Sequence, residues 1–359
     1  MMKGKIQSKH RKEYLAKRKQ VVGVSLILIA ITAILSIFSL SVNSFDVTFE
    51  ESIQAIINRI NGIEPQTYIE KMIDYVVIEV DMPRAIGAIA IGTTLAVTGS
   101  VMQSVTHNPL AEPYTIGISS AALFGVTVSI ALGFSIIPGL EKDSATAANA
   151  FLFALLPAMV IVLITTFKRL TPNMMVLVGI GMMYVFSAFT TLIKFNTDEE
   201  SLQEIYIWSL GTLSKLEWGD ILPLVVIAIV MIIAFTILAK KINILTAGDN
   251  ISQSLGVNPV RLRIVSFTLV SLGVAICVCY SGTIGFVGLV APHITRLFTG
   301  NNNRLLIPLS AMAGTLLILI GDIIVRMLPG GLPAGVITAL LGSPLFLYFL
   351  YKQRTTKNF

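Results

Sequence analysis

Residues 83–117, PRAIGAIAIGTTLAVTGSVMQSVTHNPLAEPYTIG, decide the fold of this chain. The stretch opens with a Pro–Arg pair, continues as an apolar run, breaks at the polar turn NPLAEP and enters a second apolar run. Small residues recur at every fourth position of the first run, at Ala88, Gly92, Ala96 and Ser100. This spacing places them on one helix face, where the backbone of a neighbouring helix can approach closely. The stretch predicts a membrane crossing, a cytoplasmic turn and the start of the next crossing.

The whole chain has the composition of a polytopic membrane protein. Of its 359 residues, 54% are apolar and 13% are charged, whereas soluble proteins carry roughly 25% charged residues. The net charge is +6, and many of the cations lie in the first twenty residues, directly before the apolar run 21–42. This placement indicates the cytoplasmic flank of an uncleaved first helix rather than a nucleic-acid-binding tail.

Apolar runs of about 17–25 residues mark membrane crossings, and the sequence contains ten candidates. They lie at 21–42, 84–105, 116–135, 149–167, 174–195, 221–240, 261–281, 284–299, 305–328 and 333–350. The eighth run is short and glycine-rich, as expected of a partial or tilted helix. Most of the 26 Lys and Arg residues fall on the inside when the N-terminus is placed there, so both termini are predicted to be cytoplasmic. We expect a basic tail at 1–20, a single transmembrane domain at 21–350 and a C-terminal tail at 351–359.

Two connections between crossings have patterns of their own. The outer segment 45–81 contains a helical apolar stripe that should lie along the outer membrane surface. Its members are Phe49, Ile53, Ile56, Ile57 and Ile60. The largest inside connection, 240–263, contains a short helical stretch at 249–255, which Gly256 and Pro259 should end. This loop either joins two helices and does nothing more, or it docks a cytoplasmic partner.

Motifs for soluble chemistry are absent from the sequence. It contains no GxxxxGK[ST], HExxH or GxSxG pattern. The histidines His10, His107 and His293 are far apart and do not predict a shared metal site. Cys277 and Cys279 are predicted to be buried small residues, because two positions apart on a helix they point in different directions.

Intramembrane charge is the clearest functional signal. Asp322 lies in the apolar run LLILIGDIIVRMLPG, and Arg326 follows one helical turn later. This spacing predicts an ion pair within one helix. The alternative is a proton-relay carboxylate, as a secondary transporter would need.

Two further crossings carry polar or small residues that either pack against another helix or line a polar path. The frequent glycines and prolines within the crossings favour a transporter over a simple anchor. We therefore predict a path lined by Gly179, Met183, Tyr184, Ser187, Thr191, Thr338 and Gly342.

Five motifs follow one another from residue 82 to the C-terminal region. They are PRAIGAxxxGxxLAVxGxxxQ followed by HNPLAEPYTIGISS, then LGVNPVRLR at 255–263, GTIGFVGLVAPHITR at 282–296, GDIIVR at 321–326 and LPAGVITALLGSPLF at 332–346. In order and length these motifs resemble the FecCD-type permeases, the membrane subunits of ABC importers for iron–siderophore complexes, haem and cobalamin.

The resemblance implies a type II ABC importer permease fold with ten helices. It implies a second permease, identical or homologous, as well as two cytoplasmic ATPase subunits and an extracellular binding protein that is either a lipoprotein or periplasmic. The chain itself should be non-catalytic and hold no cofactor, since ATP and Mg²⁺ belong to the ATPase. The expected location is a bacterial plasma membrane.

The resemblance also assigns roles to particular residues. Arg84 and Arg326 would meet acidic residues of the binding protein. The ATPase would be contacted by Asp249, Ser252, Leu255, Gly256, Val257, Asn258 and Pro259. The chain departs from the family pattern at Asp81, where an arginine is frequent, and at Gly331, where glutamate is common. These departures predict a partner with fewer acidic contacts at that position.

The sequence therefore predicts the permease subunit of an importer for an iron(III)–siderophore complex. Haem and cobalamin are the alternative cargoes. A proton-coupled secondary transporter is the alternative class, and an intramembrane enzyme is disfavoured because no paired catalytic groups lie at membrane depth. No metal site is expected in the permease, because the chelator holds the iron.

Overall fold

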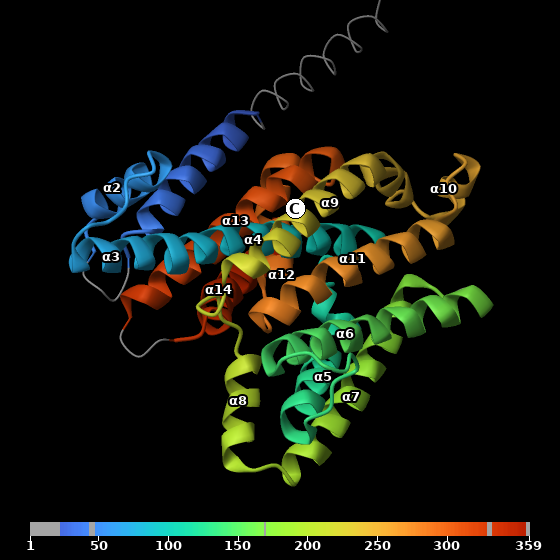
Figure 1. Cartoon of the computed structure of the whole chain (residues 1–359). Coiled ribbons are helices and arrows are strands. Elements are labelled where there is room, and N and C mark those ends of the chain that lie inside the picture. Colours follow the sequence, from blue (N-terminus) through green and yellow to red (C-terminus); the bar gives the residue numbers. More distant parts are fainter. Residues whose placement is uncertain (1–21, 43–46, 169, 329–331, 357–359) are drawn as a thin grey trace, which may run out of the picture.

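The computed structural model describes residues 22–42, 47–168, 170–328 and 332–356, and within these ranges it contains helices and no strand (Figure 1). The first helix is Val22–Ser39. It is followed by α2 (Phe49–Ile60), α3 (Tyr68–Asp74), a π-helix (Tyr75–Asp81), α4 (Met82–Val105), a 3₁₀ turn (Pro113–Ile116), α5 (Ile118–Leu132), α6 (Lys142–Phe167), α7 (Pro172–Phe195), α8 (Glu199–Ser209), α9 (Trp218–Leu245), α10 (Asp249–Ser254), α11 (Pro259–Ser281), α12 (Val287–Thr299), α13 (Asn303–Met327) and α14 (Ala334–Thr356). The predicted all-α class is confirmed.

Each predicted crossing corresponds to a helix of the structure. Seven of the described helices are long and apolar enough to span a membrane. Two shorter apolar helices are α5 and the apolar part of α14 at Ala334–Tyr348, and the remaining predicted crossing corresponds to α12. The short eighth crossing is α12, with 13 residues. Because the helices alternate in direction, the first helix begins on the side where α14 ends, and the basic residues assign that side to the cytoplasm.

The second crossing extends farther outward than the sequence predicted. Its helix runs from Tyr68 through the π-helix into α4, so it starts well before residue 84. A capping box between Thr67 and Glu70 begins it. The charges at 68–81 resemble those of a surface segment, which hid this extension from a hydropathy reading. The wider π-helical turn directs Asp81 inward, where it is 3% exposed.

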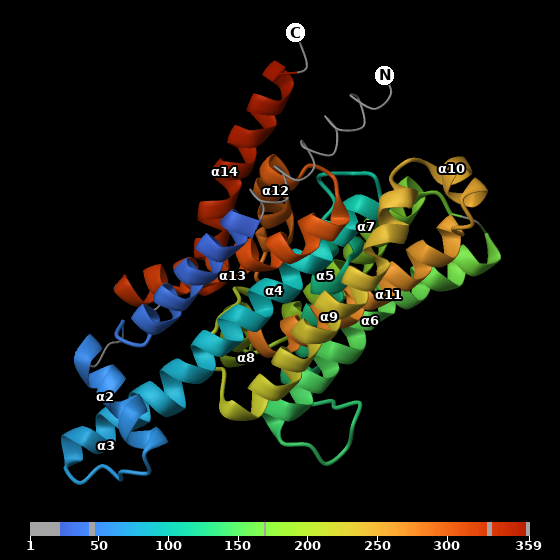
Figure 2. The same ribbon diagram turned by 90° about the horizontal axis from the view of Figure 1, so that it is seen from above.

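Helix α4 lies at the centre of one group of helices and contacts α9, α11, α12 and α13 (Figure 2). The predicted small-residue face makes these contacts possible. A Cβ on Gly92 would lie 2.6 Å from the carbonyl oxygen of Gly314 on α13. A Cβ on Gly314 would in turn collide with the Cβ of Ala96. Gly99, which the predicted face did not include, packs as closely against the backbone of Gly288 on α12. The close helix approach predicted from this spacing is confirmed.

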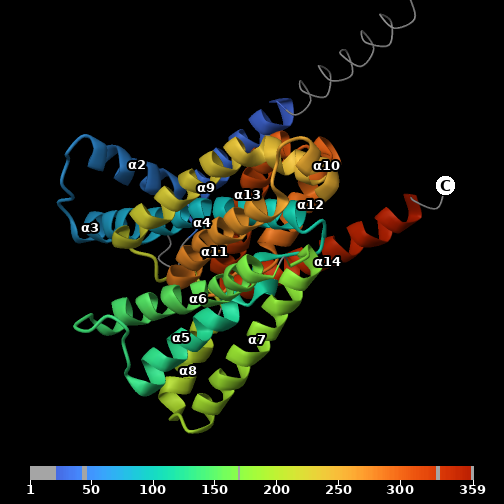
Figure 3. The same ribbon diagram turned by 90° about the vertical axis from the view of Figure 1, so that its right-hand side faces the viewer.

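Helices α5, α6 and α7 form a second group, which α6 joins to α11 (Figures 1 and 3). Helix α5 lies between α6 and α7. In contrast with α4, only 17% of the most apolar stretch of helix α7 is buried within the chain. Tyr184, Phe189 and Leu192 are among its exposed side chains. Such a face contacts lipid or another protein chain.

The predicted amphipathic helix on the outer side is present as α2. Its inward-facing residues are Ser52 and Ala55, whereas Ile57 and Ile60 of the predicted apolar stripe are exposed. Also on the outer side, Trp218 donates its indole N–H to the carbonyl oxygen of Ile78 at 3.0 Å. This bond holds the start of α9 against the π-helix.

Candidate functional site

Four buried charges meet at the outer end of the α4 group. Arg84 of α4 contacts Asp322 of α13, with its Nη2 2.7 Å and its Nε 2.8 Å from Oδ1. Arg326 contacts the same carboxylate, with its Nη2 2.8 Å and its Nε 2.9 Å from Oδ2. The predicted pair within α13 therefore exists, but Asp322 also has a second arginine partner, from α4.

The fourth member of this outer charge cluster is Asp81. Its Oδ1 lies 2.7 Å from Nη1 of Arg326. The same nitrogen donates to the carbonyl oxygens of Ser39 at 2.9 Å and Val42 at 3.3 Å. Arg326 thereby links the end of the first helix, the π-helix and α13.

The outer charge cluster contains two aspartates and two arginines and is formally neutral. The side chains are only 12% exposed at Arg84, 5% at Arg326, 4% at Asp81 and 1% at Asp322. Buried ions need such partners, because an unpaired charge away from water is strongly unfavourable. The arginine that the family often has in place of Asp81 would make the cluster positive.

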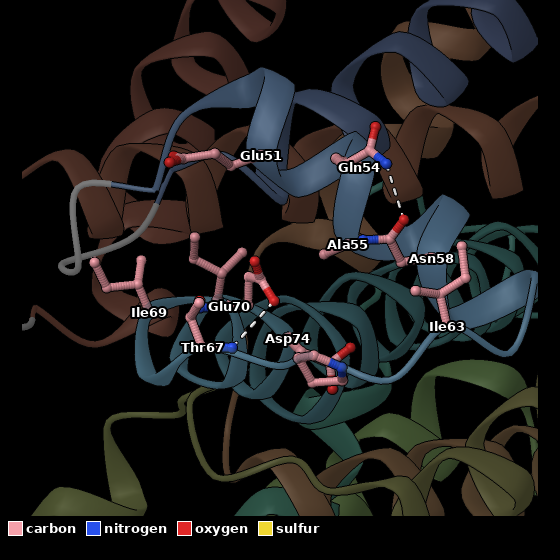
Figure 4. Close-up of a pocket in the computed structure, with 11 residues that line it drawn as sticks. Glu51, Gln54, Ala55, Asn58, Ile63, Thr67, Ile69, Glu70 and Asp74 are labelled. Carbon is pink, nitrogen blue, oxygen red and sulfur yellow. Dashed lines mark hydrogen bonds between the residues drawn. The ribbon is translucent and has the colours of Figure 1, made fainter.

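Nearer the outer surface, α2 and α3 enclose a cavity of about 300 Å³ (Figure 4). Its carboxylates already have protein partners. Glu51 and Glu70 complete the capping boxes of α2 and α3, and Asp74 lies 3.6 Å from Arg59. The cavity therefore shapes the outer surface, and its acids stabilise helix ends.

On the cytoplasmic side, α10 forms the predicted short helix. Ser252 is buried and donates to the carbonyl oxygens of Ile244 and Gly248. Asn258 caps α11 by accepting from the N–H of Arg261, and Pro259 is the first residue of that helix. These residues hold the loop in shape. Gly256, at φ +78°, allows the tight turn after the helix.

Two large aliphatic side chains are exposed on and directly after α10, beside the exposed polar residues Asn250, Gln253 and Ser254. Ile251 is 51% exposed and Leu255 is 62% exposed, whereas Val257 points inward. Two large aliphatic side chains on a short cytoplasmic helix form a surface suited to a partner protein.

A buried arginine connects α10 to the bundle. Arg263, 1% exposed, forms two hydrogen bonds with the Asp249 carboxylate at 2.7 and 2.8 Å. Its Nε donates to the carbonyl oxygen of Val105, at the end of α4, at 3.1 Å. The Arg263 hydrogen bonds lower the pKa of Asp249, and His107 adds a smaller effect in the same direction. We call this arrangement the Asp249–Arg263 clamp.

The NPLAEP turn is bound to the start of α12. Glu112 accepts a hydrogen bond from the backbone N–H of Phe286 at 2.9 Å. Phe286 precedes α12 and has φ +68°, a conformation that is unfavourable for a bulky residue. The acid thus satisfies one of the free N–H groups at this helix end.

Comparison with known proteins decides the family. The model of the FecCD transport family matches residues 31–352. The chain belongs to the FecCD family. It is therefore the permease subunit of an ABC importer of this family, and the resemblance read from its motifs is confirmed.

Relatives of this FecCD permease carry different cargo names. It is 35% identical to a probable iron chelatin transport permease of Helicobacter pylori, over 78% of this chain and 83% of the relative. It is 32% identical to a hemin transport permease of Yersinia pestis, over 78% and 84%. A solved inward-facing metal-chelate-type ABC transporter covers 92% of this chain and 99% of its own, at 28% identity and a TM-score of 0.79.

The residues predicted to line a path occupy two separate places in the FecCD permease. On α7, Tyr184, Ser187 and Thr191 are exposed. Gly179 is buried against Ile116, and Met183 is partly exposed.

On α14, Thr338 and Gly342 instead face inward. Thr338 packs near Gly321, and Gly342 packs near Phe286. One chain therefore does not bring the two sets together. The exposed α7 stripe is the part that can face a second chain.

The remaining candidates are placed as follows. Cys277 and Cys279 are free and buried, as predicted. His107 and His293, far apart in sequence, line one cytoplasmic pocket. Within the described residues, no group of three or more metal-ligating side chains is present. Gly331 lies outside those residues.

Sequence reasoning missed two of the functional contacts in the FecCD permease. It gave Arg263 no partner, although its position near the start of an apolar helix could have indicated one. It also noted Asp81 only as a departure. An acid near one helix end and an arginine on a distant helix do not by themselves predict an ion pair, because each acid in the sequence could pair with any of several arginines.

Proposed function

We propose that this FecCD permease forms the membrane path for an iron(III)–siderophore complex delivered by an extracellular binding protein. The observation that carries this function is the Asp249–Arg263 clamp, which links an exposed cytoplasmic helix to the end of the central helix α4. A partner that moves α10 can thereby move the core of the permease. Iron-chelate and hemin relatives support this class of cargo.

The working transporter contains a second permease, two ATPase subunits and the binding protein. Ile251 and Leu255 offer the ATPase an apolar surface, and the exposed face of α7 offers one to the second permease. ATP and Mg²⁺ bind to the ATPase subunits. The apolar helices show a multi-pass membrane protein, and the proposed location is a bacterial plasma membrane.

Arg84 and Arg326 are the proposed contacts for acidic residues of the binding protein. In this structure both arginines already have carboxylate partners, so an incoming acid must compete with Asp81 and Asp322. Competition of this kind gives a weak, reversible complex.

The docking role is tested by measuring how strongly the binding protein stimulates ATP hydrolysis. Arg84→Glu and Arg326→Glu should reduce stimulation, whereas Lys215→Glu, an exposed outer residue, should not. Elution as a monodisperse complex checks that each variant is folded. Equal stimulation in all three would rule out the docking role.

A proton-coupled mechanism is disfavoured by the surroundings of Asp322. Both of its carboxylate oxygens contact guanidinium groups. This is the arrangement of a structural ion pair that joins α4 to α13.

Uptake into proteoliposomes tests the function and the cargo. The vesicles contain the permease with its ATPase, the lumen supplies ATP to the ATPase side, and the medium supplies the binding protein and the cargo. Radioactive iron–siderophore should accumulate only with binding protein and ATP, and a hydrolysis-deficient ATPase should abolish uptake. Uptake that persists with the inactive ATPase would overturn the ABC mechanism. Uptake of haem or cobalamin, but not of ferric siderophore, would overturn the cargo.

A further inference from the structure

The cytoplasmic ends of α4, α9 and α12 surround a pocket of about 420 Å³. Its polar lining includes Gln103, His107, Thr246, His293, Arg296 and Asn301. All of these side chains can donate hydrogen bonds, and none of the pocket's lining residues is an acid. The volume falls in the range of about 300–1,000 Å³ that is typical of ligand pockets.

Arg296 has an environment different from the other arginines buried in the bundle. Arg84, Arg263 and Arg326 each contact a carboxylate. Across the part of the chain that the structure describes, Arg296 has no ion pair, and its buried Nε has no hydrogen-bond partner. Its Nη1 donates to Oε1 of Gln103 at 2.6 Å. This bond orients the guanidinium group without neutralising it.

His107 forms the opposite wall and is held in an uncommon conformation. Its φ is +53°, which is unusual for a residue other than glycine. Its Nε2 lies 3.0 Å from the carbonyl oxygen of Leu245. A carbonyl only accepts, so Nε2 carries the hydrogen. His293 lies on α12 one helical turn before Arg296, and it therefore shares that face of the pocket.

The carboxylate that influences His107 is already engaged elsewhere. Asp249 interacts electrostatically with His107, but its two oxygens accept from Arg263. The pocket therefore presents a guanidinium and two imidazoles without a carboxylate in its lining. Guanidinium groups bind phosphate strongly because their N–H groups match its oxygens. Basic pockets between helices on the cytoplasmic side bind phosphate head groups of lipids.

We propose that this pocket is a phosphate-binding site, with Arg296 as its principal ligand and His107 and His293 at its sides. The phosphate is either the head group of an anionic lipid or free inorganic phosphate. The site does not depend on the identity of the transported cargo.

The test uses the full-length permease in two separate measurements. Native mass spectrometry counts retained lipid after exchange into mixed phosphatidylglycerol and phosphatidylcholine. A thermal unfolding series with inorganic phosphate, matched in ionic strength by chloride, measures binding of the free anion. Preferential retention of phosphatidylglycerol identifies the lipid as the source, and stabilisation by phosphate alone identifies the free anion.

Three variants assign either effect to the pocket. Arg296→Gln should weaken binding roughly tenfold, because a charge-assisted contact is lost. Asn301→Asp changes an exposed residue and introduces a carboxylate that competes for Arg296, so it should cause a similar loss even if Arg296→Gln folds poorly. Arg304→Gln removes an exposed cation on the same side and should have no effect. The proposal would be overturned if the wild-type protein neither retained phosphatidylglycerol preferentially nor was stabilised by phosphate. It would also be overturned if all three variants bound the anion equally well.

Discussion

Asp81 shows how a single residue changes the physical setting of a family motif. In place of a frequent arginine, the chain has an acid that lies 2.7 Å from Arg326 and is almost fully buried. The neighbouring Arg326 therefore has two carboxylate partners, and the outer charge cluster has no net charge. This pairing explains why the departure is compatible with a folded protein.

Replacing Asp81 should reveal the strength of this pairing. Asp81→Asn leaves a cluster with one excess buried positive charge, which should lower the free energy of unfolding by roughly 3–5 kcal/mol. Glu79→Gln is the control, because Glu79 is 39% exposed and its partner Arg59 is exposed as well, so it should change little. Denaturant unfolding in detergent measures both, and equal effects would contradict the prediction.

Arg263 permits a second prediction, at the cytoplasmic side. Arg263→Gln loses both contacts with Asp249, so ATP-driven uptake should fall at least about tenfold. The exposed residues of α10 are unchanged, and the ATPase should therefore still bind. Arg261→Gln, an exposed neighbour, is the matched control. The measurements are uptake and ATP hydrolysis in the same vesicles. Uptake and hydrolysis that fall in proportion would indicate lost assembly rather than lost coupling.

The pH response of the clamp follows from the lowered pKa of Asp249. A lowered folded pKa stabilises the protein above the ordinary aspartate pKa of about 3.9, and the effect is lost as pH falls through the folded value. The clamp should therefore stay intact between pH 5 and 8. Uptake that varies in this interval in wild type, but not in Arg263→Gln, would show that the pair titrates there.

At the scale of elements, α4 packs closely against its neighbours because it has glycine at the contact positions. Gly99→Ala inserts a methyl group into the backbone of α12, and overpacking of this kind costs about 1–3 kcal/mol or more. Gly181→Ala on α7 meets open space and should be tolerated. Membrane abundance and the thermal midpoint distinguish the two variants. Similar midpoints would mean that α4 and α12 can move apart.

The exposed side of α10 supports a separate test of partner binding. Leu255→Glu should prevent co-purification of the ATPase without affecting the fold, because this side chain is 62% exposed. Lys241→Glu, an exposed residue at the end of α9, adds negative charge on the same side and should leave co-purification unchanged. Retention of the ATPase by the Leu255 variant would exclude α10 as its main contact.

At the scale of the whole molecule, the sequence predicted the crossings because hydropathy and length are local properties. The same reasoning found α2, α10 and the small-residue face of α4. It could not join Arg84 to Asp322 across 238 residues, or Arg263 to the end of α4 across 158. Those contacts depend on how helices pack. The π-helix also escaped prediction, since hydropathy does not reveal an extra residue in a helical turn.

The bond between Arg326 and the carbonyl oxygen of Ser39 also constrains how the protein is made. The two residues are 287 positions apart, and ribosomes add about 5–20 residues per second. Ser39 is therefore synthesised roughly 15–60 s before its arginine partner. During that interval the first hairpin lacks the contact that fixes it. The contacts of Ser39, Val42 and Asp81 with Arg326 can therefore form only after α13 has been synthesised.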